Sequence, residues 1–221
     1  MSEFEHPRWS FNITPVLLVL AAISIAVEVA LQGADWSFWG TPQWRSLAYQ
    51  NGGFWIGLLH NWRPNYYYQP YLMFSTYGFL HGGLAHLSVN MMTLVALGVP
   101  IVARIGPARF LLLYGLAAVG GAMGFALLST SVQPMVGASG ALFGLAGAIA
   151  AWEYVDRFTA EMRLWPVLRT IVWLIGLNLV LWWAMDGRLA WETHLGGFIS
   201  GWIFAFIIDP RSRPFGDENV G

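Results

Sequence analysis

The segment 137–152 reads GASGALFGLAGAIAAW, and the next charged residue after it is Glu153. An uninterrupted run of small and apolar residues is typical of a helix that crosses a membrane. Ser139 lies at the start of this run, directly before Gly140. Because polar side chains at membrane depth cost free energy, those that are present tend to have a function. The segment therefore predicts a membrane helix that begins with a candidate nucleophile.

The composition of the whole chain agrees with this segment. Hydrophobic residues make up 57% of the chain and charged residues only 10%, whereas soluble domains carry roughly 25% charged residues. We therefore expect an integral membrane protein, and the length of 221 residues predicts a single domain over residues 1–221. The net charge of −1 argues against a nucleic-acid partner. The lack of cysteine excludes disulfides, thiolate metal sites and cysteine nucleophiles.

Six stretches have the apolar character that a bilayer core requires, although the fourth is short. They are Pro15–Leu31, Gly82–Val99, Arg109–Leu128, Ala138–Ala151, Pro166–Ala184 and Thr193–Ile208. We predict an all-α polytopic membrane protein, with short amphipathic helices in the long aromatic loop 32–78 between the first two spans. Because the fourth span is short, the loop 129–135 before it is expected to dip into the protein.

The arginines predict the orientation of the chain in the membrane. Most of them fall at the two ends of the chain, between spans two and three, or between spans four and five: Arg8, Arg104, Arg109, Arg157, Arg163, Arg169, Arg211 and Arg213. Because cytoplasmic loops are enriched in basic residues, both tails, about 1–12 and 210–221, are predicted to be cytoplasmic. The first ten residues carry Glu3 and Glu5 against Arg8, so no cleavable signal is expected there. The expected location is a bacterial plasma membrane.

This orientation brings several polar residues to one side of the membrane. Spans two, four and six all begin at the outer face, and their first turns hold His81, His86, Asn90, Ser139 and His194. His86 and Asn90 are four residues apart and so share a helix face. At about 100° per residue, His81 would point away from both and pack elsewhere. The convergence of three segments at similar depth predicts a functional site.

Glycines offer a reason for two of these spans to meet. Gly140 and Gly144 form a small-residue face on the fourth span, and Gly197 and Gly201 form one on the sixth. Such faces allow helix backbones to approach closely in lipid. A close approach would hold a base within about 3 Å of Ser139, as a nucleophilic serine requires. The N-terminus of the fourth helix would also favour a developing oxyanion.

The polar and glycine residues of these three spans form the pattern His81-x4-His86-x3-Asn90, Gly137-x-Ser139-Gly140 and His194-x2-Gly197-x3-Gly201. This pattern resembles that of the rhomboid intramembrane serine proteases, and the resemblance extends over about Pro15 to Asp209. It implies a six-helix bundle and a catalytic dyad of Ser139 and His194 without a third acid. It also implies an oxyanion hole formed by the Ser139 backbone N–H, His86 and Asn90. Supporting roles are implied for His81, Gly137, Gly140, Phe143, Gly197 and Gly201.

The same resemblance implies the substrates. They would be single-pass or polytopic membrane proteins, cut within or near the bilayer by an enzyme that needs neither a cofactor nor a metal. The chain departs from the family pattern in a few places. Leu72 and Met73 occupy the positions of a frequent Trp-Arg pair, Val102 replaces a glutamate, and Phe143 replaces a tyrosine beneath the catalytic histidine. None of these is a proton-transfer group, so they do not argue against activity.

Two other functions are possible on the sequence alone. A catalytically inactive relative could bind transmembrane clients without cutting them, although Ser139 and His194 are both present. A metal-dependent enzyme or a carrier could use the three histidines, but the chain has no HExxH pattern. Three residues outside the site also receive an interpretation. Glu28 is expected to reach the membrane interface by snorkelling, and Trp182 and Trp183 are either part of a lateral gate or interfacial belt residues.

Overall fold

The computed structural model describes residues 14–209, and all the elements in that range are helices apart from one isolated β-bridge. The α-helices are α1 (Pro15–Asp35), α2 (Gln43–Gly52), α3 (Gln69–Thr76), α4 (Leu84–Ile105), α5 (Pro107–Leu128), α6 (Ser139–Thr159), α7 (Trp165–Ala184) and α8 (Trp191–Ile208). Two 3-10 helices, η1 (Ile56–Leu59) and η2 (Tyr77–Phe79), lie between α2 and α4. The all-α fold class is confirmed. The predicted tails, 1–12 and 210–221, lie outside the described residues.

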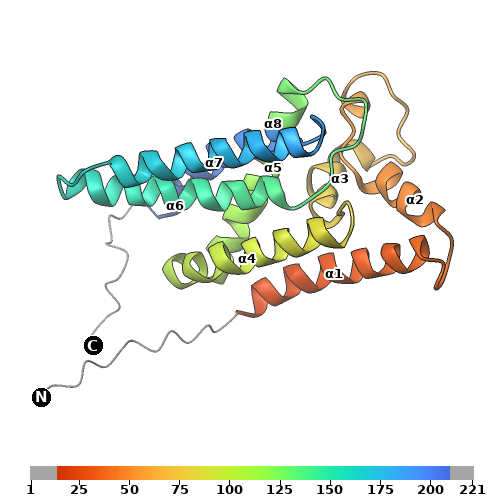
Figure 1. Ribbon diagram of the computed structural model, residues 1–221, viewed down its shortest axis with the longest axis horizontal. Helices are drawn as coiled ribbons and strands as arrows, with labels where there is room; N and C mark the ends of the chain where they lie inside the picture. Colours follow the sequence, from red (N-terminus) through yellow and green to blue (C-terminus); the bar gives the residue numbers. More distant parts are fainter. Residues whose placement is uncertain (1–13, 210–221) are drawn as a thin grey trace, which may run out of the picture.

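Each predicted span corresponds to one long helix. In Figure 1, α1, α4, α6 and α7 lie roughly along the long axis of the molecule, and α5 crosses it steeply. Within residues 14–209, four helices are long and apolar enough to cross a membrane: α1, α4, α5 and α7. The other two long helices, α6 and α8, have 21 and 18 residues; α6 carries Glu153, Asp156 and Arg157 near its C-terminal end, and α8 has Glu192 and His194 in its first turn. The chain is an integral membrane protein with a polytopic helical fold.

The predicted contact between the two glycine faces is confirmed. A methyl group on Gly197 would overlap the carbonyl oxygen of Gly140, and one on Gly201 would overlap that of Gly144. Helices α6 and α8 therefore touch backbone to backbone. Because lipid tails supply no hydrophobic drive for helix association, such close packing is a main source of cohesion within a membrane bundle.

The loop 32–78 contains short helices, as predicted, at one end of the bundle (Figure 1). It is tied to the segment before α6, because Phe54 and Met135 exchange two backbone hydrogen bonds of 3.0 Å. The prediction that 129–135 dips into the protein is wrong for most of its length. Val132 is 70% exposed and only Met135 is buried, since the serines and other polar residues of this loop favour solvent.

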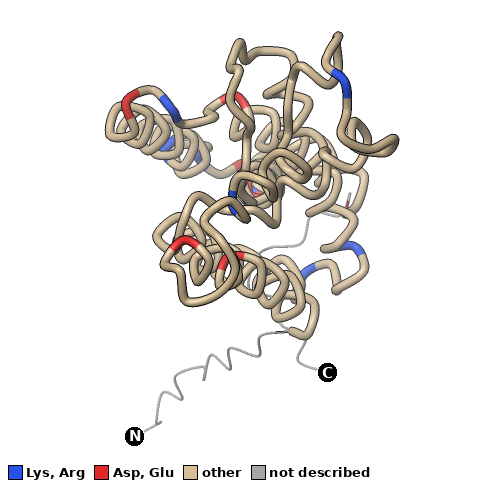
Figure 2. Tube along the Cα trace, turned by 90° about the vertical axis from the view of Figure 1, so that its right-hand side faces the viewer, with Lys and Arg blue, Asp and Glu red and all other residues tan. Residues whose placement is uncertain are grey.

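Charged residues are sparse along the helices, as Figure 2 shows. Two part-buried ion-pair clusters lie at opposite ends of α4. At its C-terminal end, Arg104 contacts Asp156 at 3.5 Å and Asp209 at 3.1 Å, and its guanidinium lies over the Trp152 ring. At its N-terminal end, Arg45 contacts Glu28 and Asp35. Each cluster joins segments that are distant in the sequence.

Candidate active site

Ser139 is the first residue of α6, and the backbone before it makes a sharp change of direction. Gly137 has φ +126°, a backbone conformation that residues other than glycine rarely adopt. Its N–H donates a 3.0 Å hydrogen bond to the Tyr77 carbonyl oxygen, which anchors the turn to the first loop. Because the first N–H groups of a helix have no partner within the helix, the turn leaves donors next to Ser139.

His194 lies in the first turn of α8 and reaches Ser139 directly. Its Nε2 is 2.8 Å from Ser139 Oγ, and the residue is only 4% exposed. The Phe143 ring stacks on the imidazole, with centroids 4.1 Å apart and an angle of 5° between the planes. Phe143 is one helical turn after Ser139, so α6 supplies both the hydroxyl and the surface that supports the base.

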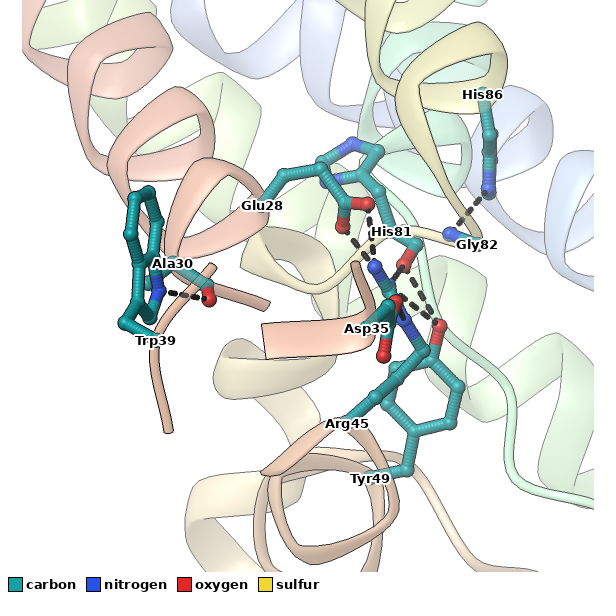
Figure 3. A network of polar contacts seen from close by, with 9 residues as sticks. All are labelled: Glu28, Ala30, Asp35, Trp39, Arg45, Tyr49, His81, Gly82 and His86. Atoms are coloured by element: carbon teal, nitrogen blue, oxygen red, sulfur yellow. Dashed lines mark hydrogen bonds and ion pairs between the residues drawn. The ribbon is translucent and has the colours of Figure 1, made fainter. Parts of the chain in front are cut away.

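His86 and Asn90 both direct nitrogen atoms at the turn before Ser139. A methyl group on Gly137 would lie 2.9 Å from His86 Nε2 and 3.9 Å from Asn90 Nδ2. His86 Nδ1 accepts a 3.2 Å hydrogen bond from the Gly82 N–H (Figure 3). The neutral ring therefore carries its proton on Nε2, and this proton points to the space that Gly137 leaves open.

Asn90 completes this group of donors. Its Nδ2 donates one hydrogen to the His86 carbonyl oxygen at 3.0 Å, which leaves the second hydrogen of the amide for another acceptor. The side chain is 4% exposed. Taken together, the two nitrogens and the N-terminus of α6 can stabilise a negative oxygen beside Ser139.

The helical spacing predicts that His81 packs away from His86, and this prediction is wrong. The two rings pack edge to face, with centroids 5.2 Å apart and an interplanar angle of 69°. The reason is that α4 begins only at Leu84. Residues 80–83 are not helical, so a rotation of about 100° per residue does not apply to His81.

Burial and the neighbouring His86 lower the pKa of His81 from 6.5 to about 4. Between pH 4 and pH 6.5, His81 is therefore protonated in the unfolded chain and neutral in the folded protein. The contribution of His81 to the free energy of unfolding should therefore be fully present above pH 6.5. The free energy of unfolding should fall by about 3 kcal/mol as the pH drops to 4. We expect His81→Gln to reduce this loss in detergent unfolding curves, whereas His60→Gln, at an exposed position, should not. An unchanged pH dependence in His81→Gln would contradict the assignment.

A partly buried arginine, Arg45, holds the segment that carries His81 and Gly82 (Figure 3). Arg45 donates to both carboxylate oxygens of Glu28, at 2.8 and 3.1 Å, and to Asp35 at 2.6 Å. It also donates to the His81 carbonyl oxygen at 2.9 Å, and the Tyr49 hydroxyl donates to the same oxygen at 2.7 Å. The first loop is thereby clamped to the turn that orients His86.

This clamp corrects the interpretation of Glu28. The side chain does not snorkel to the interface but is fully buried against Arg45. Burial alone would lower the pKa of Arg45, but hydrogen bonds to Glu28, Tyr49 and Asp35 outweigh it and raise that pKa above its ordinary value. Removing Arg45 would leave the buried Glu28 without its ion-pair partner, which typically costs about 3–5 kcal/mol.

One residue of the site is absent from the sequence-based prediction. Asn178 Oδ1, on α7, is 2.6 Å from His194 Nδ1. The prediction was a dyad without a third acid, and Asn178 is a neutral third partner of the histidine. The available signal was its position, because an amide in the middle of an apolar span is costly unless it has a partner.

Other expected site residues have packing positions. Gly140 is buried against Tyr77 and Thr193, where a methyl group would lie 3.0 Å from the tyrosine hydroxyl oxygen and 2.6 Å from Thr193 Cγ2. Met73 and Val102, at two of the positions that depart from the family pattern, are buried apolar residues. Within residues 14–209, no three histidine or acidic side chains lie close enough to hold a metal ion, so nothing there favours the metal alternative.

Comparison with known proteins places these residues in a family. Residues 67–211 match the sequence model of the Rhomboid domain. The chain belongs to the rhomboid family. It is 34% identical over 142 residues to RHOMBOID-like protein 1 of Arabidopsis thaliana, a match that covers 63% of this chain and 36% of that protein. Over 138 residues it is also 34% identical to Rhomboid protease GluP of Bacillus subtilis, with 62% of this chain and 26% of that protein covered.

Rhomboid relatives of this chain differ in activity. Inactive RHOMBOID-like protein 8 of Arabidopsis thaliana is 27% identical over 167 residues, which cover 72% of this chain and 42% of that protein. The matches to RHOMBOID-like proteins 1, 5, 4 and 2 of Arabidopsis thaliana cover between about a third and a half of the length of those proteins. Family membership thus gives the fold and a membrane setting. The site residues must decide between a protease and an inactive rhomboid.

Proposed function

We propose that this rhomboid is an intramembrane serine endopeptidase that cuts transmembrane segments of membrane-anchored proteins. The observation that carries the proposal is the 2.8 Å contact between Ser139 Oγ and His194 Nε2. A serine hydroxyl beside a neutral imidazole is the arrangement from which acyl transfer proceeds. The similarity to a relative named as a rhomboid protease supports the same class of reaction.

In the proposed reaction, Ser139 attacks the scissile carbonyl carbon while His194 takes the hydroxyl proton. His194 then gives this proton to the leaving amine, and a water activated in the same way hydrolyses the acyl-enzyme. The oxygen that becomes negative would accept hydrogen bonds from the Ser139 N–H, His86 Nε2–H and Asn90 Nδ2–H. Loss of one such donor typically lowers the rate by about a hundredfold or more.

The proposed substrate is a membrane helix that unwinds near its outer end and presents an extended backbone to Ser139. With both termini cytoplasmic, the site would open to the external face, where water can enter. The distribution of arginines supports this orientation. A bacterial plasma membrane is the location we propose, and the part of the site nearest to Gly137 would receive the scissile bond.

A fluorophosphonate probe tests the proposal, because it reacts with activated serine nucleophiles. We expect the purified protein in detergent to be labelled and Ser139→Ala to be unlabelled. Ser75→Ala is the matched control: Ser75 is exposed on α3 and its hydroxyl donates to the Leu72 carbonyl oxygen rather than to a histidine, so labelling should persist. The wild type should also cleave a membrane-anchored reporter in proteoliposomes, and Ser139→Ala should not.

The outcome that would sink the proposal is a wild type that neither reacts with the probe nor cuts the reporter while a control serine hydrolase reacts. Binding of the intact reporter under those conditions would favour an inactive rhomboid that holds transmembrane clients. Loss of cleavage on chelation, with Ser139→Ala still active, would favour the metal alternative.

A further inference from the structure

The amide of Asn178 is oriented by its own helix. Asn178 Nδ2 donates a 3.2 Å hydrogen bond to the Leu174 carbonyl oxygen, one turn earlier in α7. The oxygen of the amide is therefore the atom that faces His194 Nδ1, at 2.6 Å. The opposite orientation would place two oxygens together at Leu174 and would lose the hydrogen bond there. The hydrogen bonds leave one favourable arrangement.

This arrangement decides which nitrogen of His194 carries the proton. An amide oxygen can only accept, so His194 Nδ1 must donate to Asn178. The neutral ring then has an unprotonated Nε2, the atom that lies 2.8 Å from Ser139 Oγ. Only this tautomer can take the serine proton, and an imidazole in the wrong tautomer cannot act as the base.

The surroundings of this contact strengthen it. Asn178 and His194 lie on an apolar groove of about 650 Å³ between α7 and α8, whose other walls include Ile171, Trp182, Leu195 and Phe198. In such a medium a hydrogen bond is stronger than in water, and an amide without a partner is costly. Among residues 14–209, no other side-chain hydrogen bond joins α7 to another helix.

Helix α7 is otherwise loosely held. Of its residues only Val167 is buried. Packing therefore does little to fix the side chains of α7 against α8, and the polar contact itself sets the distance between Asn178 and His194.

We propose that Asn178 is a positioning residue for the catalytic base. Ser139 on α6, His194 on α8 and Asn178 on α7 then act as a triad. This inference rests on the proposed function for its effect on rate. Its structural content, the tautomer of His194, is independent of activity.

Kinetics of three variants test the effect on rate. Asn178→Ala should lower kcat by about 10- to 100-fold, part of the contribution of a well-placed general base, with KM changed by less than about twofold because no substrate contact is lost. Asn178→Asp should recover most of this loss, since a carboxyl oxygen accepts from Nδ1–H whether or not the group is ionised. Leu177→Ala, at an exposed neighbouring position on α7, is the control and should match the wild type.

Nitrogen NMR of protein labelled with ¹⁵N-histidine tests the tautomer directly. The chain has five histidines, and the His194 signals can be assigned by their loss in His194→Gln. We expect protonated Nδ1 and unprotonated Nε2 in the wild type, and a mixture of tautomers in Asn178→Ala. Protonated Nε2 in the wild type, or an Asn178→Ala variant in which either kcat or the tautomer is unchanged, would overturn the proposal.

The two proposals fail in different ways. A wild type without Ser139-dependent cleavage would refute the proposed function, while the nitrogen spectra would still decide the role of Asn178. A protease in which Asn178→Ala retains full kcat would refute the triad and leave the proposed function intact.

Discussion

Replacing His194 with alanine should lower kcat for reporter cleavage by at least about 10⁴-fold, because it removes the proton acceptor and donor of both chemical steps. The side chain contacts Ser139 Oγ at 2.8 Å and stacks on Phe143, and no other described histidine or carboxylate is hydrogen-bonded to that hydroxyl. Initial rates in proteoliposomes measure the loss. Labelling of Ser139 by a fluorophosphonate should fall with it, since an unassisted hydroxyl is a weak nucleophile.

His60→Ala is the matched control for this experiment. His60 is exposed in the first loop, so its removal should leave kcat within about twofold of the wild type, as for surface changes away from a site. A His194→Ala protein that is folded and keeps more than about a tenth of the wild-type kcat would show that another group acts as the base.

Gly201→Ala should destabilise the folded protein by about 3 kcal/mol or more, because an added methyl group cannot be accommodated by a rotamer change. The atom in its way is the backbone carbonyl oxygen of Gly144. Helices α6 and α8 would have to separate, and His194 would move away from Ser139. Equilibrium unfolding in mixed micelles measures the stability, and reporter cleavage should be lost in parallel.

Gly176→Ala is the control for helix glycines. Gly176 lies in α7 with nothing within 4 Å of the position of an added methyl group. Alanine there should leave stability unchanged or raise it by up to about 1 kcal/mol, the difference in helix propensity. If Gly201→Ala were as stable as Gly176→Ala, the close contact between α6 and α8 could not be the basis of the site geometry.

The parts of this protein that sequence analysis predicted depend on local composition or on short spacings. Six apolar stretches give six long helices because a helix satisfies its own backbone hydrogen bonds in lipid. The glycines of α6 and α8 predict their contact because only small residues allow such an approach. His86 and Asn90 share a face because both lie within one helix.

Two of the incorrect predictions concern single side chains, His81 and Glu28. The helical rotation assigned to His81 is wrong because α4 begins only at Leu84, after the Gly82-Gly83 turn, so His81 lies outside the helix. Glu28 is buried rather than snorkelling because Arg45, 17 residues later, folds back onto it. The first error comes from a helix boundary, and the second from a partner that another segment supplies.

The sequence by itself determined the membrane class, the order of the helices and which of them begin with Ser139, His86 and His194. Only the tertiary structure decided that Asn178 faces His194 and that Arg45 clamps the turn beside His86. The physical reason is that hydropathy and periodicity describe each helix against lipid, one at a time. A hydrogen bond between two helices depends on their separation and rotation, which the packing of the whole bundle sets.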